Sequence, residues 1–245
     1  MPTILVDQNI VTYGDIMRPT RSNGVIGYRR KDPVGEDGSW LRREFRALPT
    51  VSKLIIAGDI SAFRYVELDF ENWKRKGSAS GSNLGNLFPN SVMKQVEPAI
   101  ERSYYFQAFM NEYLYTRSVA NFCKWLNTKG IEESALKVAK SKNATDDMLR
   151  NIRNVSRYQE MCKKLQKTEQ YIDAFHLWTA EINDIEYFVT ADRKFINAIN
   201  KLDCKCQPIL PSELLTQMNL EASEPFQFKE NVFYGIGGQY MWEFD

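Results

Sequence analysis

Four acidic residues of this chain stand at places where strand-like or helical stretches of the sequence begin or end. In chain order they are Asp7, Glu67, Asp173 and Asp192. Carboxylates that gather without basic partners repel one another, so a site that collects four of them requires a cation. All-oxygen ligation suits Mg²⁺ or Mn²⁺ and disfavours zinc. If the four side chains converge, the chemistry they point to is that of a divalent metal site.

The elements that must position these carboxylates alternate between strands and helices. The apolar and polar patterns predict strands at 3–6, 60–66, 187–190 and 206–210, and helices at 41–57, 67–76, 172–182 and 211–218. Such alternation predicts an α/β fold with a parallel sheet. The carboxyl ends of parallel strands lie at one edge of a sheet, where ligands bind. We therefore expect the four carboxylates to converge at that edge.

Three segments fall outside this alternation. Residues 14–39 are expected to form a long polar loop, and 77–165 an all-helical insertion that is entered through a Gly-, Ser- and Asn-rich joint. Six aromatic residues between 104 and 115 would stack nucleic-acid bases or, more commonly, build a core. The tail 220–245 is aromatic and acidic around Gly-Ile-Gly-Gly, which predicts a hairpin at a sheet edge or on a partner. Its acidity suggests a cover for a basic groove.

Composition places the chain among ordinary globular proteins. It has 245 residues, of which 43% are apolar and 26% charged. Its apolar runs are far shorter than the roughly 18–20 residues that span a bilayer, and its start does not resemble an export signal. We therefore expect a cytoplasmic protein without a membrane partner. Cys204 and Cys206 with the single histidine, His176, cannot easily complete a zinc site, so free thiols are expected.

The net charge of +1 hides local asymmetry. Residues 18–46 carry eight basic and four acidic side chains, and residues 137–167 carry nine and three. Basic surfaces of this kind are compatible with a phosphate-rich partner such as RNA. In the segment 145–167 the basic residues also recur at the spacing of a solvated helix face.

Four stretches of the sequence resemble, in order, the acidic motifs of the PIN-domain nucleases, with the VapC-type toxins as the most similar group. They read ILVDQNIV, ISAFRYVELDFENW, DAFHLWTAEI and YFVTADRKF, and CQPILPSELL is similar to the last strand and helix of that family. The resemblance covers residues 1–76 and about 166–219. It implies a PIN-like three-layer fold in which helices flank a central parallel sheet.

The resemblance also implies a function. A PIN-domain nuclease uses Mg²⁺ or Mn²⁺ to hydrolyse phosphodiester bonds, most often in RNA and in some cases in single-stranded DNA. Asp7, Asp173 and Asp192 are then the metal ligands, direct or through water, and Glu67 is a fourth ligand or orients the attacking water. Asn9 and Thr190 fit supporting roles. An antitoxin or other protein partner and a homodimer are further expectations.

Each assignment has an ordinary structural alternative. Asp7 and Asp192 would serve as helix caps, Glu71 would replace Glu67, and Asp173 would be a surface residue. Thr190 would simply end a strand, and we expect His176 to be a packed core histidine. The alternative for the whole chain is a PIN-like scaffold that binds RNA or protein without cutting it. In that case the insertion and the tail carry the function.

Overall fold

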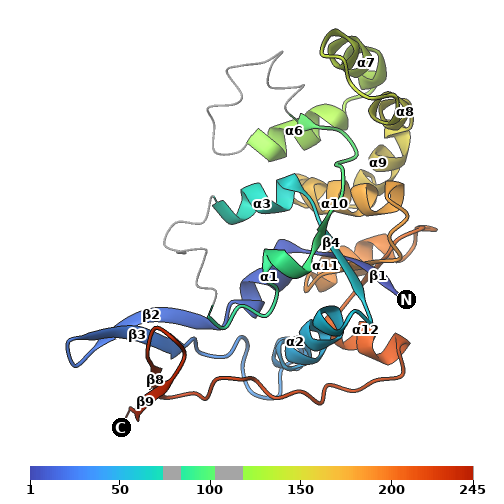
Figure 1. Cartoon of the computed structure of the whole chain (residues 1–245). Coiled ribbons are helices and arrows are strands. Elements are labelled where there is room, and N and C mark those ends of the chain that lie inside the picture. The colour runs from blue at the N-terminus through green and yellow to red at the C-terminus, as the bar shows by residue number, and fades with distance from the viewer. Residues whose placement is uncertain (74–83, 103–117, 245) are drawn as a thin grey trace. The chain divides into compact units, whose positions relative to one another are not determined.

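A computed structural model describes residues 1–73, 84–102 and 118–244 (Figure 1). The aromatic residues between 104 and 115 lie outside this part of the chain. The strands are β1 Thr3–Val6, β2 Met17–Ser22, β3 Val25–Arg30, β4 Ser61–Arg64, β5 Lys94–Gln95, β6 Tyr187–Val189, β7 Gln207–Ile209, β8 Val232–Tyr234 and β9 Tyr240–Glu243. The helices are α1 Gln8–Gly14, α2 Trp40–Ala57, α3 Val66–Trp73, α6 Ser118–Leu126, α7 Ile131–Ser141, α8 Asp146–Arg153, α9 Val155–Cys162, α10 Tyr171–Ile182, α11 Arg193–Ile199 and α12 Pro211–Gln217, with 3₁₀ turns at Asn90–Val92 and Thr168–Gln170.

Five strands form a parallel sheet in the order β5-β4-β1-β6-β7. β1 pairs with β4 in parallel, with Thr3 opposite Ser61 and Leu5 opposite Phe63. The apolar residues of β1 are buried on both faces, as expected for a strand inside a parallel sheet. The predicted α/β class with a parallel sheet is therefore confirmed.

The chain divides into two compact units. The first comprises residues 1–95, 189–191 and 209–245, and the second comprises 96–188 and 192–208. In the first unit α2 packs against α12. The buried Glu44 of α2 accepts hydrogen bonds of 2.8 Å from the backbone N–H and from the hydroxyl of Ser212. These bonds satisfy polar groups at the start of α12.

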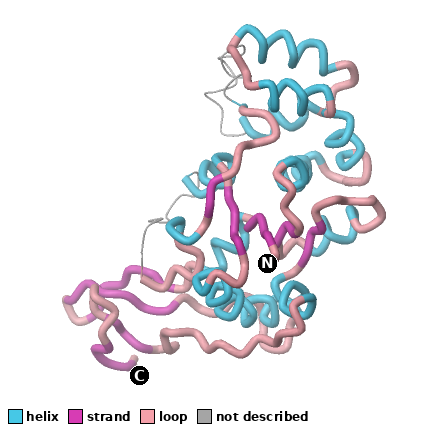
Figure 2. The backbone as a smooth tube through the Cα atoms, turned by 45° about the vertical axis from the view of Figure 1, so that its right-hand side comes forward, coloured by secondary structure: helices cyan, strands magenta, loops and turns pink. Residues whose placement is uncertain are grey.

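Residues 14–39 contain a hairpin, so the expectation of a loop there was wrong. Asn23 and Gly24 form its turn with φ values of 48° and 77°, the left-handed conformation that an Asn-Gly pair adopts in tight hairpins. β3 also pairs with β8, and β8 with β9, which gives an antiparallel sheet in the order β2-β3-β8-β9. The two hairpins lie side by side near the C-terminus (Figures 1 and 2). The sequence of β2 does not predict a strand, because most of its side chains are polar and solvated.

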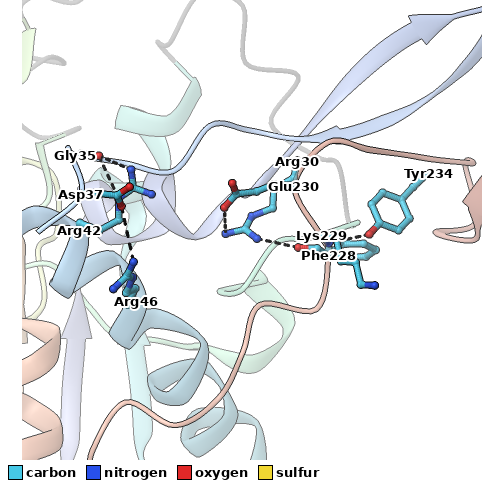
Figure 3. A network of polar contacts seen from close by, with 9 residues as sticks. All are labelled: Arg30, Gly35, Asp37, Arg42, Arg46, Phe228, Lys229, Glu230 and Tyr234. Atoms are coloured by element: carbon cyan, nitrogen blue, oxygen red, sulfur yellow. Dashed lines mark hydrogen bonds and ion pairs between the residues drawn. The ribbon is translucent and has the colours of Figure 1, made fainter. Parts of the chain in front are cut away.

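The segment before β8 is attached to β3 through Arg30. Arg30 donates a hydrogen bond of 3.0 Å to the Phe228 carbonyl, and its guanidinium lies 3.4 Å from the Glu230 carboxylate. Figure 3 shows both contacts. The same guanidinium lies 4.4 Å from the centroid of the Phe226 ring. Burial lowers the pKa of Arg30 from its ordinary value. Much of the tail is thus built into the first unit.

In the second unit α10 packs against α6 and α9. The helix is buried from Ala174 to Glu181, and its Phe175 and Trp178 rings join those of Phe122 and Tyr158 in an aromatic core. This burial accounts for the apolar sequence of α10.

The region 77–165 is not all-helical, which corrects the predicted insertion. Lys94 and Gln95 form β5, which pairs in parallel with Phe63 and Arg64 of β4. Pro98 follows closely, and a proline disfavours helix in the residue before it. In the described part of the chain, no helix combines the length and the apolar character that crossing a membrane requires.

Candidate active site

Asp7, Asn9 and Thr190 form a closed hydrogen-bond network. The Asn9 amide donates to Asp7 Oδ2 at 2.6 Å and to Thr190 Oγ1 at 3.0 Å. The Thr190 hydroxyl in turn donates to the same Asp7 Oδ2 at 2.6 Å. Ala191 N–H donates to Asn9 Oδ1 at 3.1 Å, and Asp7 N–H donates to the Val189 carbonyl at 3.0 Å. The orientation of the Asp7 carboxylate is therefore fixed by two donors on one oxygen.

Asp7 occupies the N-cap position of α1 but does not cap it. Its side chain accepts no hydrogen bond from the helix backbone. Helix-capping aspartates are held by the backbone N–H groups of the first turn. Asp7 is instead 4% exposed and directed toward Asn9 and Thr190. The capping alternative therefore does not explain this residue.

Glu67 lies in the first turn of α3, just beyond the end of β4, and is 2% exposed. Because β4 and β1 are parallel neighbours, Glu67 and Asp7 both follow the carboxyl ends of adjacent strands. α3 also packs against α1. The side chain of the alternative residue, Glu71, lies outside the described part of the chain. Glu67 thus shares with Asp7 the sheet edge that the sequence predicted.

Arg64, the last residue of β4, supports the start of α3. It is buried, forms an ion pair with Asp69 and donates a hydrogen bond to Asn90 Oδ1. Burial lowers the pKa of Arg64 from its ordinary value. A buried cation requires such partners. Arg64 belongs to none of the residues predicted from the sequence to form the site.

Asp173 and Asp192 belong to the second unit. Asp173 lies in the first turn of α10 and is half-buried. Asp192 caps α11, because its Oδ1 accepts hydrogen bonds from Lys194 N–H at 2.9 Å and Phe195 N–H at 3.0 Å. The capping alternative therefore describes one role of Asp192. His176 is buried beside Phe188, as expected for a core residue.

The Asp7 network suits Mg²⁺ or Mn²⁺ in the type of its donor atoms. The Asp7 carboxylate offers oxygen, which these hard cations prefer, whereas Asn9 Oδ1 and Thr190 Oγ1 already take part in the hydrogen-bond network. Across residues 1–73, 84–102 and 118–244, no group of three or more histidine, cysteine, aspartate and glutamate side chains is arranged to hold a metal ion. A protein Mg²⁺ site often has only one or two carboxylates and completes its shell with water and substrate phosphate. The Asp7 network fits a site of that kind.

The hairpin of β2 and β3, which carries much of the basic charge of residues 18–46, was not predicted from the sequence. Residues 16–31 contain five basic side chains and no acidic one. The dipeptide Asn23-Gly24, which is a strong hairpin signal, would have revealed the two strands.

In comparisons with known proteins, no family model, no curated protein and no solved structure matches this chain. The resemblance to PIN-domain nucleases accordingly rests on the four motif stretches of the sequence.

Proposed function

We propose that this protein is a Mg²⁺- or Mn²⁺-dependent ribonuclease with a PIN-like core. The observation that carries the proposal is the Asp7 side chain, which turns away from its own helix toward Asn9 and Thr190. A buried carboxylate that is held in this way beyond the end of a parallel strand, and that does not cap its helix, supports a role as a ligand. The order of the four acidic motifs supports the same function.

The residues of the chain have distinct roles in this proposal. Asp7 and Glu67 would hold the cation, and Asp173 and Asp192 are proposed as further ligands on their sequence motifs alone. When bound, the metal ion supplies an activated water and neutralises charge on the phosphate. The Asn9 amide and the Thr190 hydroxyl keep the Asp7 carboxylate in one orientation, which lowers the cost of binding. Glu67 would also orient the attacking water.

The test is a cleavage assay on mixed-sequence RNA and single-stranded DNA with Mg²⁺, with Mn²⁺ and without metal. Asp7→Asn keeps the size of the side chain but removes its charge, so we expect metal-dependent cleavage to be lost. Asp59→Asn is the matched control. Asp59 is exposed and precedes β4, at the opposite edge of the same sheet, so its substitution should leave cleavage unchanged.

Cleavage that survives Asp7→Asn, or that does not require a metal, contradicts the proposal. Binding of RNA without any cleavage favours the alternative of a PIN-like scaffold. Circular dichroism of both variants establishes that a loss of activity does not reflect unfolding.

A further inference from the structure

A single row of side chains crosses the whole antiparallel sheet. Arg18 of β2 lies opposite Arg29 of β3, Arg29 opposite Phe233 of β8, and Phe233 opposite Trp242 of β9. Directly opposite residues of antiparallel strands place their side chains on the same face. One face of this sheet therefore carries two arginines beside two aromatic rings.

The aromatic half of the row is tightly stacked. The Phe233 and Trp242 rings are nearly parallel, at 15°, with centroids 4.4 Å apart, and Phe233 is fully buried. Phe244 meets Phe233 edge-on at 6.2 Å. A Cβ on Gly27 would fall 2.6 Å from Phe233 Cζ, so this glycine lets the ring lie against the β3 backbone. Trp242 covers Phe233 and remains partly exposed itself.

The cationic half of the row is not neutralised by the sheet. The Arg29 guanidinium lies 4.8 Å from the Phe244 ring centroid and donates a hydrogen bond to the Asn231 amide oxygen, so neither partner carries charge. Arg18 is exposed, and in the described part of the chain its guanidinium has no hydrogen-bond or ion-pair partner. In contrast, Arg30 on the opposite face pairs with Glu230 (Figure 3).

The four strands place no acidic side chain on this face. Glu243 is the only acidic residue in the four strand sequences, and it lies opposite Val232. Its position alternates with that of Trp242, so its side chain is on the other face. The face that holds Arg18 and Arg29 is thus positively charged as well as aromatic.

Single-stranded nucleic acid has the chemistry that fits this combination. Its phosphates require cationic donors, and its unpaired bases stack on aromatic rings. A purely structural aromatic cluster would explain Phe233 and Trp242 but would give Arg18 no role. We propose that this face binds single-stranded RNA, with backbone phosphates on Arg18 and Arg29 and a base against the exposed side of Trp242. The choice of RNA rests on the proposed ribonuclease function.

Equilibrium binding in EDTA tests the proposal without cleavage by a metal-dependent activity. The probe is a fluorescein-labelled single-stranded RNA of mixed sequence, followed by anisotropy at several salt concentrations. Arg18→Ala should raise the Kd about fivefold or more and reduce the slope of log Kd against log salt by about one. Trp242→Leu should raise the Kd by a similar factor, because a stacked base is lost, and leave the slope unchanged.

Arg43→Ala is the matched control. Arg43 is an exposed arginine of α2, outside the sheet, and its loss should change the Kd less than twofold. Melting temperatures of all variants show whether the sheet remains folded. Arg18→Ala protein that binds RNA as tightly as the parent overturns the proposal. Equal weakening by Arg18→Ala and Arg43→Ala also overturns it, because the effect would then reflect net charge alone.

The outcomes separate this proposal from the ribonuclease proposal. Binding that depends on Arg18 and Trp242, without any metal-dependent cleavage, supports the RNA face and contradicts the nuclease. Cleavage that requires Asp7, with binding indifferent to Arg18 and Trp242, does the reverse. Equal competition by duplex RNA overturns the stacking of an unpaired base on Trp242. If Arg18→Ala abolishes the binding of a protein partner but leaves the binding of RNA unchanged, RNA is overturned as the ligand of this face.

Discussion

The Thr190 hydroxyl donates a 2.6 Å hydrogen bond to Asp7 Oδ2, between residues that lie 183 positions apart in the sequence. Replacement by valine keeps the shape of Thr190 but removes the donor. A buried carboxylate that loses a partner costs about 1–3 kcal/mol of unfolding free energy. We expect Thr190→Val to lower stability in urea by that amount. Under the proposed ribonuclease function cleavage should also fall about tenfold, because Thr190 would then orient a metal ligand.

Thr216→Val provides the comparison for this change. The Thr216 hydroxyl donates to the Ser212 carbonyl within α12, on the protein surface. We expect a change below about 0.5 kcal/mol for this variant. Equal losses of unfolding free energy for the two threonine variants would mean that the hydrogen bond to Asp7 contributes no more to stability than one on the surface.

Gly27→Ala should disrupt the antiparallel sheet. The added Cβ would overlap the Tyr234 carbonyl oxygen as well as the Phe233 ring. Overpacking of this kind costs about 1–3 kcal/mol. Gly24→Ala is the comparison, because its φ of +77° is strained for alanine but no atom lies within 4 Å of the new Cβ. Urea midpoints should fall for both variants, and only Gly27→Ala should also weaken RNA binding through displacement of Phe233.

Arg157 and Glu181 form a bidentate pair in the second unit, with N···O distances of 2.9 and 2.8 Å. The hydrogen bonds to Glu181 raise the pKa of Arg157 above its ordinary value. Arg157→Met leaves Glu181, whose side chain is only 4% exposed, without its cation, so we expect a loss of about 3–5 kcal/mol. Calorimetry or urea unfolding measures it.

The exposed pair of Arg150 and Asp147 gives a contrasting case. Its N···O distance is also short, 2.9 Å, but the two side chains are 66% and 75% exposed. Arg150→Met should therefore cost less than about 1 kcal/mol. A similar loss of unfolding free energy for the two arginine variants would contradict the prediction that burial makes the Arg157 pair the more important for stability.

The Cys204 thiol should react slowly in the folded protein. Burial, followed by the charge of Glu181, raises its pKa from 9.0 to about 11. At pH 8 the thiolate fraction is then roughly a hundredfold smaller than for an unperturbed thiol. A thiol-specific reagent should accordingly modify Cys204 slowly at pH 8 and rapidly in urea. Fast modification of the native protein would contradict this burial.

The same shift predicts how stability depends on pH. Above pH 9 the unfolded thiol loses its proton while the folded thiol keeps it until about pH 11. Unfolding therefore becomes easier as the pH rises through this window, and the contribution is constant below it. Between pH 8 and pH 10 the parent should lose about 1 kcal/mol more than Cys204→Ser. Identical pH profiles of the two proteins would contradict the shift.

The parallel sheet could be predicted because its strands are short apolar runs with strong local signals. Ile4 to Val6 is such a run, and Pro211 marks the start of α12. β2 could not be recognised by periodicity because its side chains are mostly solvated and its pairing partner gives it order. β5 has only two residues and exists through its pairing with β4, which no local pattern encodes.

The candidate site was predictable to a similar extent. Motif order located Asp7, Asn9 and Thr190, and the structure brings these three together. Whether an aspartate after a strand caps a helix depends on the direction of its side chain. Asp7 and Asp192 both lie between a strand and a helix but differ in the direction of their side chains, and only the tertiary hydrogen bonds reveal this difference. The row of Arg18, Arg29, Phe233 and Trp242 could not be predicted because it joins residues from both ends of the chain.

The pairing of β3 with β8 also imposes an order of events during protein synthesis. β2 and β3 leave the ribosome roughly 200 residues before the strands that complete their sheet. Until then the hairpin has an unpaired edge and no aromatic cover. A nascent chain therefore lacks the proposed RNA face while its ribosome, itself rich in RNA, is still close.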